Sequence, residues 1–505
     1  MSPQPEASPK ILSRRLNSEL SLSFDDVLLE PGFSETLPSE VNVSTRLGPL
    51  QLNIPVLSAA MDTVTESQTA IALALLGGMG VLHKNGTPEF QAGEVRRVKK
   101  FQHAVISNPV TVTQHETIAT LFEIIAETGV TGFPVISDSG KLVGMCTGRD
   151  IRHVSDRSTR VVDVMSSPVH SLGVGATPDQ ATAFFRKYKV EKLPLIDSEG
   201  RLIGLITSRD LRQATDSPLA VRDQNGSLRV AAAVGVGPEQ GLARAEVLVQ
   251  AGVDALVVDS AHGHSAGVLG TLRDLRAKYK NLVLIGGNVA TLAGAKALIE
   301  AGAQVVKIGI GPGSICTTRI VSGAGVPQLT AILNVAEQLR KEFPNIGIIA
   351  DGGIRYSGDA TKALGAGAHA IMLGSMFAGT DESPGETILY MGRSYKTYRG
   401  MGSLGAMKRG SSERYFQSTT REASKLVPEG VEARVPNRGS LAQVVHQLVG
   451  GIKSGMGYVG AKDMTELYAK ACFRRISAGA LRESHVHDVT ITRESPNYSG
   501  GHGEE

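Results

Sequence analysis

The stretch AGVDALVVDSAH, residues 251–262, contains the three features that decide the fold. It opens with an Ala-Gly pair, in which glycine supplies the left-handed residue that stops a helix. The apolar run ALVV then predicts a buried strand, and the polar residues Asp259 and Ser260 follow it. The same stop precedes a strand at Ala301-Gly302 and at Ala366-Gly367. The chain therefore repeats a unit of helix, glycine stop and buried strand.

Short β-branched runs alternate with Ala- and Leu-rich helical patterns along the chain, which is typical of parallel strands joined by helices. Eight such runs occur: PVLSAA (55–60), MGVLHK (79–84), LRVAAAVG (228–235), ALVVDSAH (255–262), LVLIGGNV (282–289), QVVKIGIG (304–311), IGIIADGG (346–353) and AIMLGS (370–375). Eight strand-and-helix units are what a (β/α)8 barrel requires. The predicted fold class is α/β, a (β/α)8 TIM barrel with an inserted module.

The segment between the second and third runs has to be an insertion, because about 140 residues is far too long for a barrel connection. It contains a tandem repeat, in which TGFPVISDSGKLVGMCTGRDI (131–151) aligns with EKLPLIDSEGRLIGLITSRDL (191–211). Two copies this similar should pack as a pseudo-twofold pair. Each copy resembles a cystathionine-β-synthase-type (CBS) domain. We therefore expect a first barrel part (1–102), a tandem CBS module (103–215) and a second barrel part (216–505).

The CBS resemblance implies a cleft for adenine or guanine nucleotides. The candidate ribose contacts are Thr147, Asp150, Thr207 and Asp210. An insert with a purely structural role is the alternative, and we expect regulation by purine nucleotides.

The composition is that of a globular protein and excludes several classes. With 505 residues, of which 41% are hydrophobic, the chain can form more than one core. A net charge of +3 and a single short basic run, RRVKK (96–100), neither suggest nor exclude a nucleic-acid surface. No apolar stretch approaches the roughly 20 residues of a membrane span, and the polar start MSPQPEASPK lacks the apolar stretch of a secretory signal. We expect a cytoplasmic protein.

Polar residues at the ends of the predicted strands indicate the active site, because a barrel carries its site where its strands end. These residues are Ser58, Asp259, Ser260, Asn288, Cys316, Asp351 and Ser375. Core packing explains poorly why apolar strands should each end in a polar residue at one rim. The sequence therefore predicts a site at that rim.

Glycine-bearing turns follow the last two strands, in DGGIR (351–355) and LGSMFAGT (373–380). Barrels commonly hold a phosphate at these two loops through backbone N–H groups. Together with GSI (313–315), they favour a phosphorylated ligand over simple tight turns. Asp351 would repel a phosphate but is a good acceptor for two ribose hydroxyls. A nucleoside monophosphate fits this combination.

Cys316 lies in GPGSICTTR (311–319), a loop of glycines and hydroxyl residues. The chain's three cysteines are widely separated and odd in number, which argues against a disulfide framework and a thiolate zinc site. An inert, small hydrophobic cysteine would fit a strand or helix better than this loop. A thiolate here could add to an electron-poor carbon of a base, while Thr317 and Thr318 donate or relay protons.

A second long insertion, at about 381–447, follows the eighth strand. Long loops at this end of a barrel are usually lids or substrate clamps. We therefore expect a mobile flap.

Several motifs resemble the inosine-5′-monophosphate (IMP) dehydrogenase family in its bacterial form. They are SAAMDTVTE (58–66), VLHKN (81–85), IGGNVAT (285–291), GIGPGSICTTR (309–319), ADGGIR (350–355), YRGMGSLGAM (398–407) and ERYFQ (413–417). The resemblance runs from residue 21 to residue 498. It implies that Cys316 attacks C2 of the hypoxanthine ring and that hydride passes to NAD. It also implies that Arg414, as base, and Tyr415 enter with the flap, and that Thr318 helps to activate water for hydrolysis.

Arginine is a poor base by its reference pKa, since it is effectively always protonated in water. Only a desolvated pocket and a hydrogen bond from Tyr415 could lower that cost. An electrostatic clamp is the other interpretation of Arg414.

The resemblance also implies ligand contacts, one residue at a time. The IMP contacts would be Ser58, Ser314, Asp351, Gly353, Gly374, Ser375, Tyr398, Gly400, Met401, Gly402 and Glu429. The NAD contacts would be Asp259, Ser260, His262, Asn288 and Thr318. Tyr458 of a neighbouring subunit would contact the adenine ring of the cofactor. No GxGxxG opens a helix after a strand, so the cofactor would bind without a Rossmann domain.

A potassium ion is implied at the backbone carbonyls of Gly311, Gly313 and Cys316, with Glu483, Ser484 and His485 of an adjacent chain. A site shared between chains implies a homotetramer, and pairing of tetramers into an octamer is left open.

Three other functions fit parts of the sequence. GMP reductase has similar loops but usually lacks the CBS insert and the Arg-Tyr flap. A nucleotide-sensing regulator with an inactive barrel is the second alternative. The presence of the four candidate catalytic residues argues against it, and these are Cys316, Thr318, Arg414 and Tyr415. A divalent-metal hydrolase could use His262-His264 or His485-His487, but no other strand end offers a histidine or paired carboxylates.

Overall fold

The computed structural model describes residue 17, residues 19–101, residue 106 and residues 109–208, 217–415, 417 and 423–498. The chain divides into two compact units. One unit consists of residues 1–99, 219–223 and 228–505, and the other of residues 100–218 and 224–227. The bounds of the second unit are close to those of the predicted insert, 103–215.

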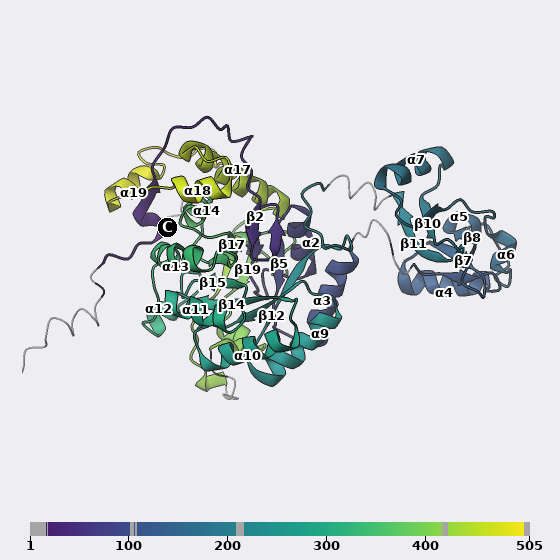
Figure 1. The fold of residues 1–505 in the computed structure, drawn as a ribbon, viewed down its shortest axis with the longest axis horizontal. Coiled ribbons are helices and arrows are strands. Elements are labelled where there is room, and N and C mark those ends of the chain that lie inside the picture. Colours follow the sequence, from purple (N-terminus) through teal and green to yellow (C-terminus); the bar gives the residue numbers. More distant parts are fainter. Residues whose placement is uncertain are drawn as a thin grey trace, which may run out of the picture. The chain divides into compact units, whose positions relative to one another are not determined.

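The first unit is built on a closed parallel barrel of eight strands in the order β12-β13-β14-β15-β16-β17-β4-β5. Figure 1 shows these strands inside a ring of helices. The strands are β4 (Val56–Ser58), β5 (Met79–Leu82), β12 (Val230–Val234), β13 (Ala255–Asp259), β14 (Val283–Val289), β15 (Val305–Ile308), β16 (Gly347–Asp351) and β17 (Ala370–Leu373). Each lies within one of the eight predicted runs, so the predicted TIM barrel is confirmed.

Helices cover the outside of the barrel. They are α2 (Ser67–Leu75), α3 (Pro88–Lys100), η2 (Pro238–Ala243), α9 (Arg244–Gln250), α10 (Ala266–Lys278), α11 (Leu292–Glu300), α13 (Gln328–Glu342) and α14 (Ser357–Gly365). The short helices α12 (Thr318–Val321) and α15 (Ser375–Ala378) belong to the segments that follow β15 and β17. Three of the outer helices end as predicted, because Gly252, Gly302 and Gly367 have φ angles of 90°, 107° and 113°. A side chain would be strained at those angles.

Inward-facing apolar residues of the strands fill the barrel. Alternate residues of a strand point to the same face, so Val305 and Lys307 of β15 both face inward. Val305 belongs to the apolar core, together with Val257, Ile285, Ile349 and other fully buried residues. Lys307 is also buried, at 2% exposure, and its ammonium lies at the end of the barrel where the strands end.

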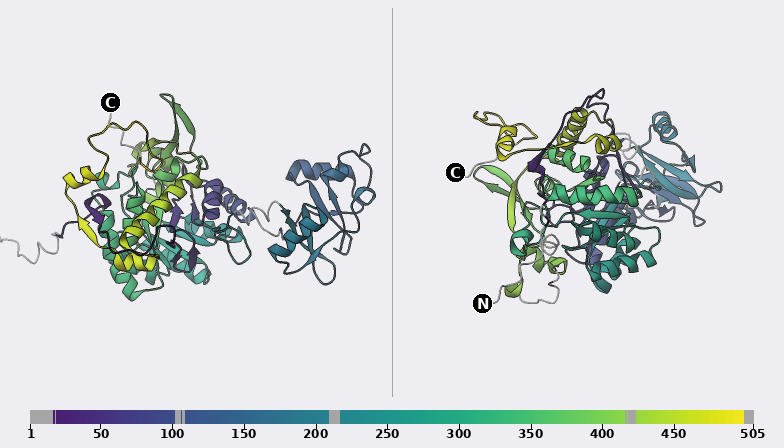
Figure 2. Two further views of the ribbon diagram at one scale, coloured as in Figure 1. Left: turned by 90° about the horizontal axis from the view of Figure 1, so that it is seen from above. Right: turned by 60° about the vertical axis from the view of Figure 1, so that its left-hand side comes forward.

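The segment after β17 contains more regular structure than the predicted flap of 381–447. Strands β18 (Thr387–Tyr390), β19 (Arg393–Arg399) and β20 (Glu432–Pro436) form an antiparallel sheet. Figure 2 shows the β18–β19 hairpin standing out from the barrel. Between β19 and β20 lie α16 (Leu404–Lys408), η3 (Ser411–Tyr415) and η4 (Ala423–Lys425). Residues 441–447 belong to the long helix α17 (Leu441–Val459), which packs against α14.

The remaining elements of this unit come from the two ends of the chain. They are η1 (Phe24–Asp26), β1 (Val27–Leu29), β2 (Thr45–Leu47), β3 (Leu50–Leu52), α18 (Met464–Lys470), β21 (Phe473–Arg475) and α19 (Ala478–Ser484). Strand β1 pairs with β21, so the two ends of the unit are joined.

The second unit consists of two similar halves. Each half has a three-stranded sheet and a helix, with β6 (Val112–Thr113), β7 (Gly132–Ile136), β8 (Leu142–Thr147) and α4 (Ile118–Thr128) in the first. The other half has β9 (Leu172–Gly173), β10 (Lys192–Ile196), β11 (Leu202–Thr207) and α7 (Pro178–Tyr188), and α5 (Gly148–Ile151) and α6 (Val161–Val164) complete the unit. Gly132 pairs with Thr147 as Lys192 pairs with Thr207, at equivalent positions of the repeat.

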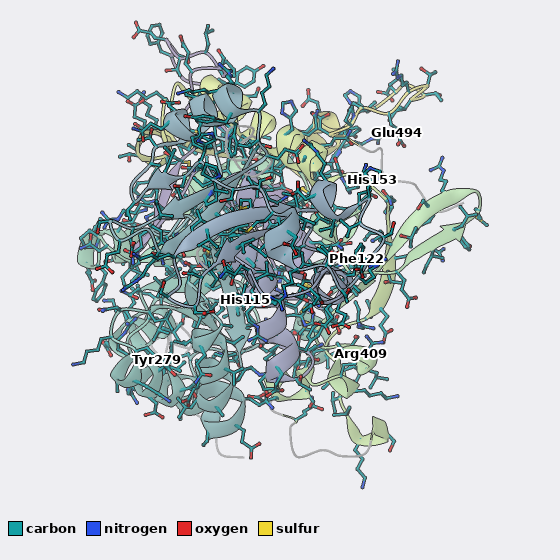
Figure 3. All side chains as sticks on the ribbon, turned by 90° about the vertical axis from the view of Figure 1, so that its right-hand side faces the viewer. His115, Phe122, His153, Tyr279, Arg409 and Glu494 are labelled. Atoms are coloured by element: carbon teal, nitrogen blue, oxygen red, sulfur yellow. The ribbon has the colours of Figure 1, made fainter. Side chains whose placement is uncertain are left out.

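Each half has a hydrophobic core of its own. Phe133 and Leu121 are fully buried in the first core, and Phe122, labelled in Figure 3, packs against it from α4. Leu193 and Ala181 are fully buried in the second core. The repeat therefore corresponds to two structural copies.

Candidate active site

A cavity opens where the barrel strands end, and the predicted catalytic residues line it together with several predicted ligand contacts. The predicted residues in its wall are Asp259, Asn288, Gly311, Gly313, Cys316, Thr318, Asp351, Tyr398, Gly400, Met401, Gly402, Arg414, Tyr415 and Glu429. They come from strand ends, from the cysteine loop and from the segment after β17. The fold thus brings together residues that lie far apart in the sequence.

The cysteine loop is held by backbone hydrogen bonds. The Cys316 N–H donates to the carbonyl of Gly313 at 3.0 Å, and the Thr317 N–H donates to the carbonyl of Glu429 at 3.0 Å. The Sγ of Cys316 lies 3.1 Å from Oγ1 of Thr318. The thiol therefore faces the cavity with a hydroxyl beside it, as the sequence predicts.

Arg319 fixes the base of the same loop. Its guanidinium donates to the carbonyls of Ile310, at 3.1 Å, and Val326, at 2.6 Å. Burial lowers the pKa of Arg319, and the nearby Cys316 opposes that shift because a thiolate there would favour the positive charge.

A second cavity adjoins the first on the side of the glycine turns. The predicted residues Ser314, Gly353, Gly374 and Ser375 line it, and Asp351 and Tyr398 line both cavities. Gly352 and Gly353 have φ angles of 89° and 82°, which only glycine adopts without strain. A methyl group on Gly374 would lie 2.9 Å from Oη of Tyr398, so backbone forms the wall here. Exposed main chain of this kind suits a phosphate.

Tyr398 stands between the two cavities. Burial raises the pKa of its phenol well above the usual range, and a hydrogen bond with Ser314 opposes that shift. The phenol is therefore protonated near neutral pH and can donate a hydrogen bond.

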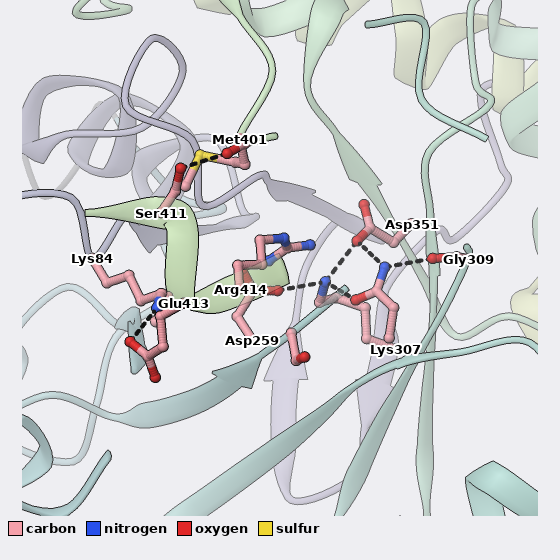
Figure 4. A network of polar contacts seen from close by, with 12 residues as sticks. Lys84, Asp259, Lys307, Gly309, Asp351, Met401, Ser411, Glu413 and Arg414 are labelled. Carbon is pink, nitrogen blue, oxygen red and sulfur yellow. Dashed lines mark hydrogen bonds and ion pairs between the residues drawn. The ribbon is translucent and has the colours of Figure 1, made fainter. Parts of the chain in front are cut away.

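Lys307 was not predicted, yet it is the centre of the polar network in Figure 4. Its ammonium donates to Oδ1 of Asp259 at 3.1 Å and to Oδ2 of Asp351 at 2.6 Å, and it also contacts Oδ1 of Asn288. The Asn288 amide donates to the same Oδ2 of Asp351 at 2.9 Å. One lysine thus holds three predicted ligand contacts. The period-2 pattern of β15 places Lys307 on the inner face, which is the signal that could have revealed it.

Arg414 and Tyr415 of η3 lie inside the cavity. The guanidinium of Arg414 forms an ion pair with Asp259, and Tyr415 packs on Gly402, where a Cβ atom would lie 2.8 Å from its ring. Burial lowers the pKa of Arg414, although Tyr415 opposes this through its charge and a hydrogen bond. Burial raises the pKa of Tyr415, against the effect of Arg414.

Several predicted ligand contacts lie outside the walls of these two cavities. Ser58 is fully buried and accepts a hydrogen bond from Thr65 at 2.8 Å. Ser260 is buried beside the cavity, His262 is exposed, and Tyr458 is 69% exposed on α17. Glu483 and Ser484 end helix α19, where the ring of His485 lies 6.0 Å from that of Tyr356.

The predicted regulatory residues occupy equivalent places in the repeat. Thr147 and Asp150 form a capping box at the start of α5, with Oγ1 of Thr147 donating to Oδ2 of Asp150 at 2.7 Å. Thr207 ends β11 as Thr147 ends β8. Asp210 lies outside the described residues.

Two further observations concern metals and membranes. In the described part of the chain, no group of three or more His, Cys, Asp or Glu side chains could hold a metal ion. No helix among the described residues combines the length and the apolar character that a membrane span needs.

A parallel barrel with a loop cysteine, carboxylates and a glycine-lined pocket at the ends of its strands has the architecture of a (β/α)8-barrel enzyme. The chain belongs to the IMP dehydrogenase / GMP reductase domain family, which matches residues 21–487. It is 55% identical to the inosine-5′-monophosphate dehydrogenase of Aquifex aeolicus (strain VF5), over 94% of this chain and 97% of the relative. It is 54% identical to that of Escherichia coli (strain K12), over 95% and 98% of the two chains. These matches confirm the prediction of an IMP dehydrogenase.

A solved structure is also similar, that of a cysteine-to-alanine variant of GMP reductase from Trypanosoma brucei in complex with guanosine 5′-monophosphate. The TM-score is 0.83 at 40% identity, and the match covers 94% of this chain and 98% of that one. So long a match includes most of the repeat segment. The inserted repeat therefore does not by itself distinguish this chain from that reductase.

Proposed function

We propose that the chain oxidises IMP to xanthosine 5′-monophosphate with NAD, in two steps that use the same cavity. The observation that supports this proposal best is the ion pair between Arg414 and Asp259. Asp259 is a predicted cofactor contact, and here a residue of the flap occupies it. Cofactor and flap would then take turns at one carboxylate, as a two-step reaction requires.

In the first step, the nucleotide is held by both cavities. The glycine turns and Ser375 bind its phosphate, and Asp351 accepts from the ribose hydroxyls. Lys307 and Asn288 already bind Oδ2 of Asp351, so Oδ1 is directed to the ligand. The Cys316 thiolate attacks C2 of the hypoxanthine ring, and the C2 hydrogen leaves with its electron pair as hydride. NAD supplies the hydride acceptor, and a thioimidate of Cys316 remains.

The second step is hydrolysis of that thioimidate. Arg414 and Tyr415 fill the space beside Cys316, and Thr318, 3.1 Å from its sulfur, orients the water. Water adds to C2, the C2–S bond breaks, and the thiolate is restored. Burial lowers the free-energy cost of deprotonating Arg414, but its ion pair with Asp259 favours the charged form. We propose that Arg414 accepts the water proton as Tyr415 supports the neutral guanidine.

The remaining contacts involve ligands and partner chains. Asp259, Ser260, His262, Asn288 and Thr318 would bind the cofactor, with Tyr458 of a second subunit at its adenine. The backbone carbonyls of Gly311, Gly313 and Cys316 are hard oxygen donors, which suit potassium, together with Glu483, Ser484 and His485 of a second subunit. We propose a cytoplasmic homotetramer whose tandem repeat binds purine nucleotides.

GMP reductase is the second candidate function, because the similar Trypanosoma brucei structure is that of a GMP reductase. A reductase has no need for a hydrolytic flap. The burial of Arg414 and Tyr415 beside Cys316 therefore favours the dehydrogenase.

The direction of the reaction can be tested by the absorbance of the reduced cofactor. We expect the absorbance of the reduced cofactor to rise when IMP, NAD and potassium are supplied, and not to fall when GMP and NADPH are supplied. The Cys316→Ala variant should show no change in absorbance. Oxidation of NADPH by GMP in the absence of IMP turnover would overturn the proposal.

A further inference from the structure

Glu413, the residue before Arg414 and Tyr415, makes a separate contact with the barrel. Its Oε2 lies 3.0 Å from the ammonium of Lys84, and its Oε1 accepts from the Val236 N–H at 2.5 Å. Figure 4 shows that Glu413 and Arg414 extend to different sides of η3, with Arg414 toward Asp259 and Glu413 toward Lys84. The flap thus contacts both the cavity and the barrel beside it.

The two partners of Glu413 belong to the rigid part of the barrel. Lys84 follows β5 by two residues, and Val236 follows β12 by two residues. Strands β5 and β12 are hydrogen-bonded neighbours, so the carboxylate bridges two adjacent strand ends. Gly235 makes room for it, because a Cβ atom there would lie 2.4 Å from Oε1 of Glu413. The site is shaped to receive this carboxylate.

Lys84 has a strong requirement for a negative partner. It is only 3% exposed, and burying an ammonium without a counter-charge is costly. Burial lowers the pKa of Lys84, and the nearby cations Arg414 and Arg244 lower it further, whereas Glu413 raises it. Arg244 is bound by neutral groups, among them Gln91 at 2.9 Å and the Gly86 carbonyl at 3.0 Å. Arg414 pairs with Asp259, so Glu413 is the carboxylate that contacts Lys84 directly.

We propose that Lys84 and Glu413 form a latch that positions Arg414 and Tyr415 in the cavity for the hydrolytic step. The inference rests on the proposed role of the flap, and it adds two positioning residues that act through Arg414 rather than on the substrate. When the flap leaves the cavity for the cofactor, the Lys84–Glu413 pair breaks. The buried Lys84 then favours the return of the flap.

The latch predicts that the two reaction steps respond differently to its loss. Hydride transfer takes place with the flap outside the cavity, so Lys84→Met and Glu413→Gln should leave the first turnover within about twofold. Hydrolysis needs the flap inside, so steady-state turnover should fall roughly 10- to 100-fold, the range expected for losing one charged hydrogen bond. The covalent nucleotide adduct of Cys316 should accumulate.

Rapid mixing with IMP and NAD measures both quantities, as a burst of reduced cofactor followed by a steady rate. Matched controls are the exposed residues of the same segment, Lys408→Met and Glu386→Gln, which should retain both phases. The double variant K84M/E413Q should be no slower than either single variant, because the two residues act as one pair. Thermal unfolding of each variant establishes that it is folded.

Arg414→Ala separates failure of the latch from failure of the proposed function. If this variant keeps the burst and loses steady turnover while K84M and E413Q behave like wild type, the latch is wrong and the flap mechanism stands. Equal loss of both phases in K84M or E413Q, or additive losses in the double variant, would also overturn the latch. If Arg414→Ala loses both phases equally, the proposed flap mechanism itself fails, and the latch with it.

Discussion

Two buried lysines at the end of the barrel show opposite ways of satisfying a charge. Lys307 and Lys84 are 2% and 3% exposed, so both need negative partners. The carboxylates that Lys307 contacts, Asp259 and Asp351, end strands of the same barrel. The carboxylate of Lys84 comes from Glu413, which lies 329 residues further along the chain and on the flap.

The two lysines differ in whether their carboxylate partners belong to barrel strands or to the segment after β17. The partners of Lys307 remain in place whenever the barrel is folded, so its network holds the ligand contacts in position. In the proposed latch, the partner of Lys84 is present only when η3 occupies the cavity. On that proposal, identical side chains at similar depth serve a permanent and a conditional function.

The largest effect should come from removing the permanent charge. Lys307→Met removes the cation shared by the buried Asp259 and the partly exposed Asp351, and breaking a buried pair costs about 3–5 kcal/mol. We expect the free energy of unfolding to fall by about that amount, and both reaction phases to slow at least about 100-fold because the ligand contacts shift. Chemical denaturation and rapid mixing measure the two quantities. An unchanged burst would show that Lys307 does not position the site.

His369 represents a third solution, in which a buried group stays neutral. His369 directly precedes β17, and its Nδ1 accepts a hydrogen bond from the Ile348 N–H at 3.1 Å. Burial, together with the nearby charge of Arg340, lowers the pKa of His369 from 6.5 to about 3. Below pH 6.5 the unfolded chain therefore takes up a proton that the folded chain refuses, so acid weakens the fold. Between pH 6.5 and about pH 3 we expect this histidine to account for a loss of roughly 4–5 kcal/mol.

His369→Gln is the variant that isolates this contribution. Its unfolding free energy should depend less steeply on pH over that range than the free energy of the wild type. Parallel slopes would show that His369 titrates normally in the folded chain.

The smallest effect should come from deleting residues 103–215. The repeat unit has its own two cores, so its loss should leave turnover within about twofold while removing the response to purine nucleotides. Steady-state assays with and without added ATP and GTP measure this. Loss of basal activity would mean that the insert supports the barrel.

The barrel and most of the site could be predicted because each strand carries its own signal. Runs such as VLIGGNV are mostly apolar and carry a polar residue at or next to their end, and Asn288 and Asp351 indeed line the cavity. The β18–β19 hairpin was not predicted. Met391 and Gly392 have φ angles of 48° and 73°, which is the backbone of a two-residue hairpin turn.

Other features could not be predicted from one sequence. The pairing of Glu413 with Lys84 depends on where the flap docks, and no local pattern encodes that. Tyr458 and His485 were predicted to contact the cofactor and the potassium ion of a neighbouring subunit. The structure of a single chain does not test these contacts. Ser58 was expected at the ligand, but it lies beneath the cavity wall, where it accepts a hydrogen bond from Thr65.

The central claim is that Cys316 forms a bond to the purine, and intact-mass measurement tests it most directly. When Arg414→Ala is mixed with IMP and NAD and quenched in acid, we expect a protein heavier by one IMP less two hydrogen atoms, with the added mass on the peptide that contains Cys316. The double variant C316A/R414A should show no such species. An unmodified protein that still produces reduced cofactor, or an adduct on another residue, would contradict the account.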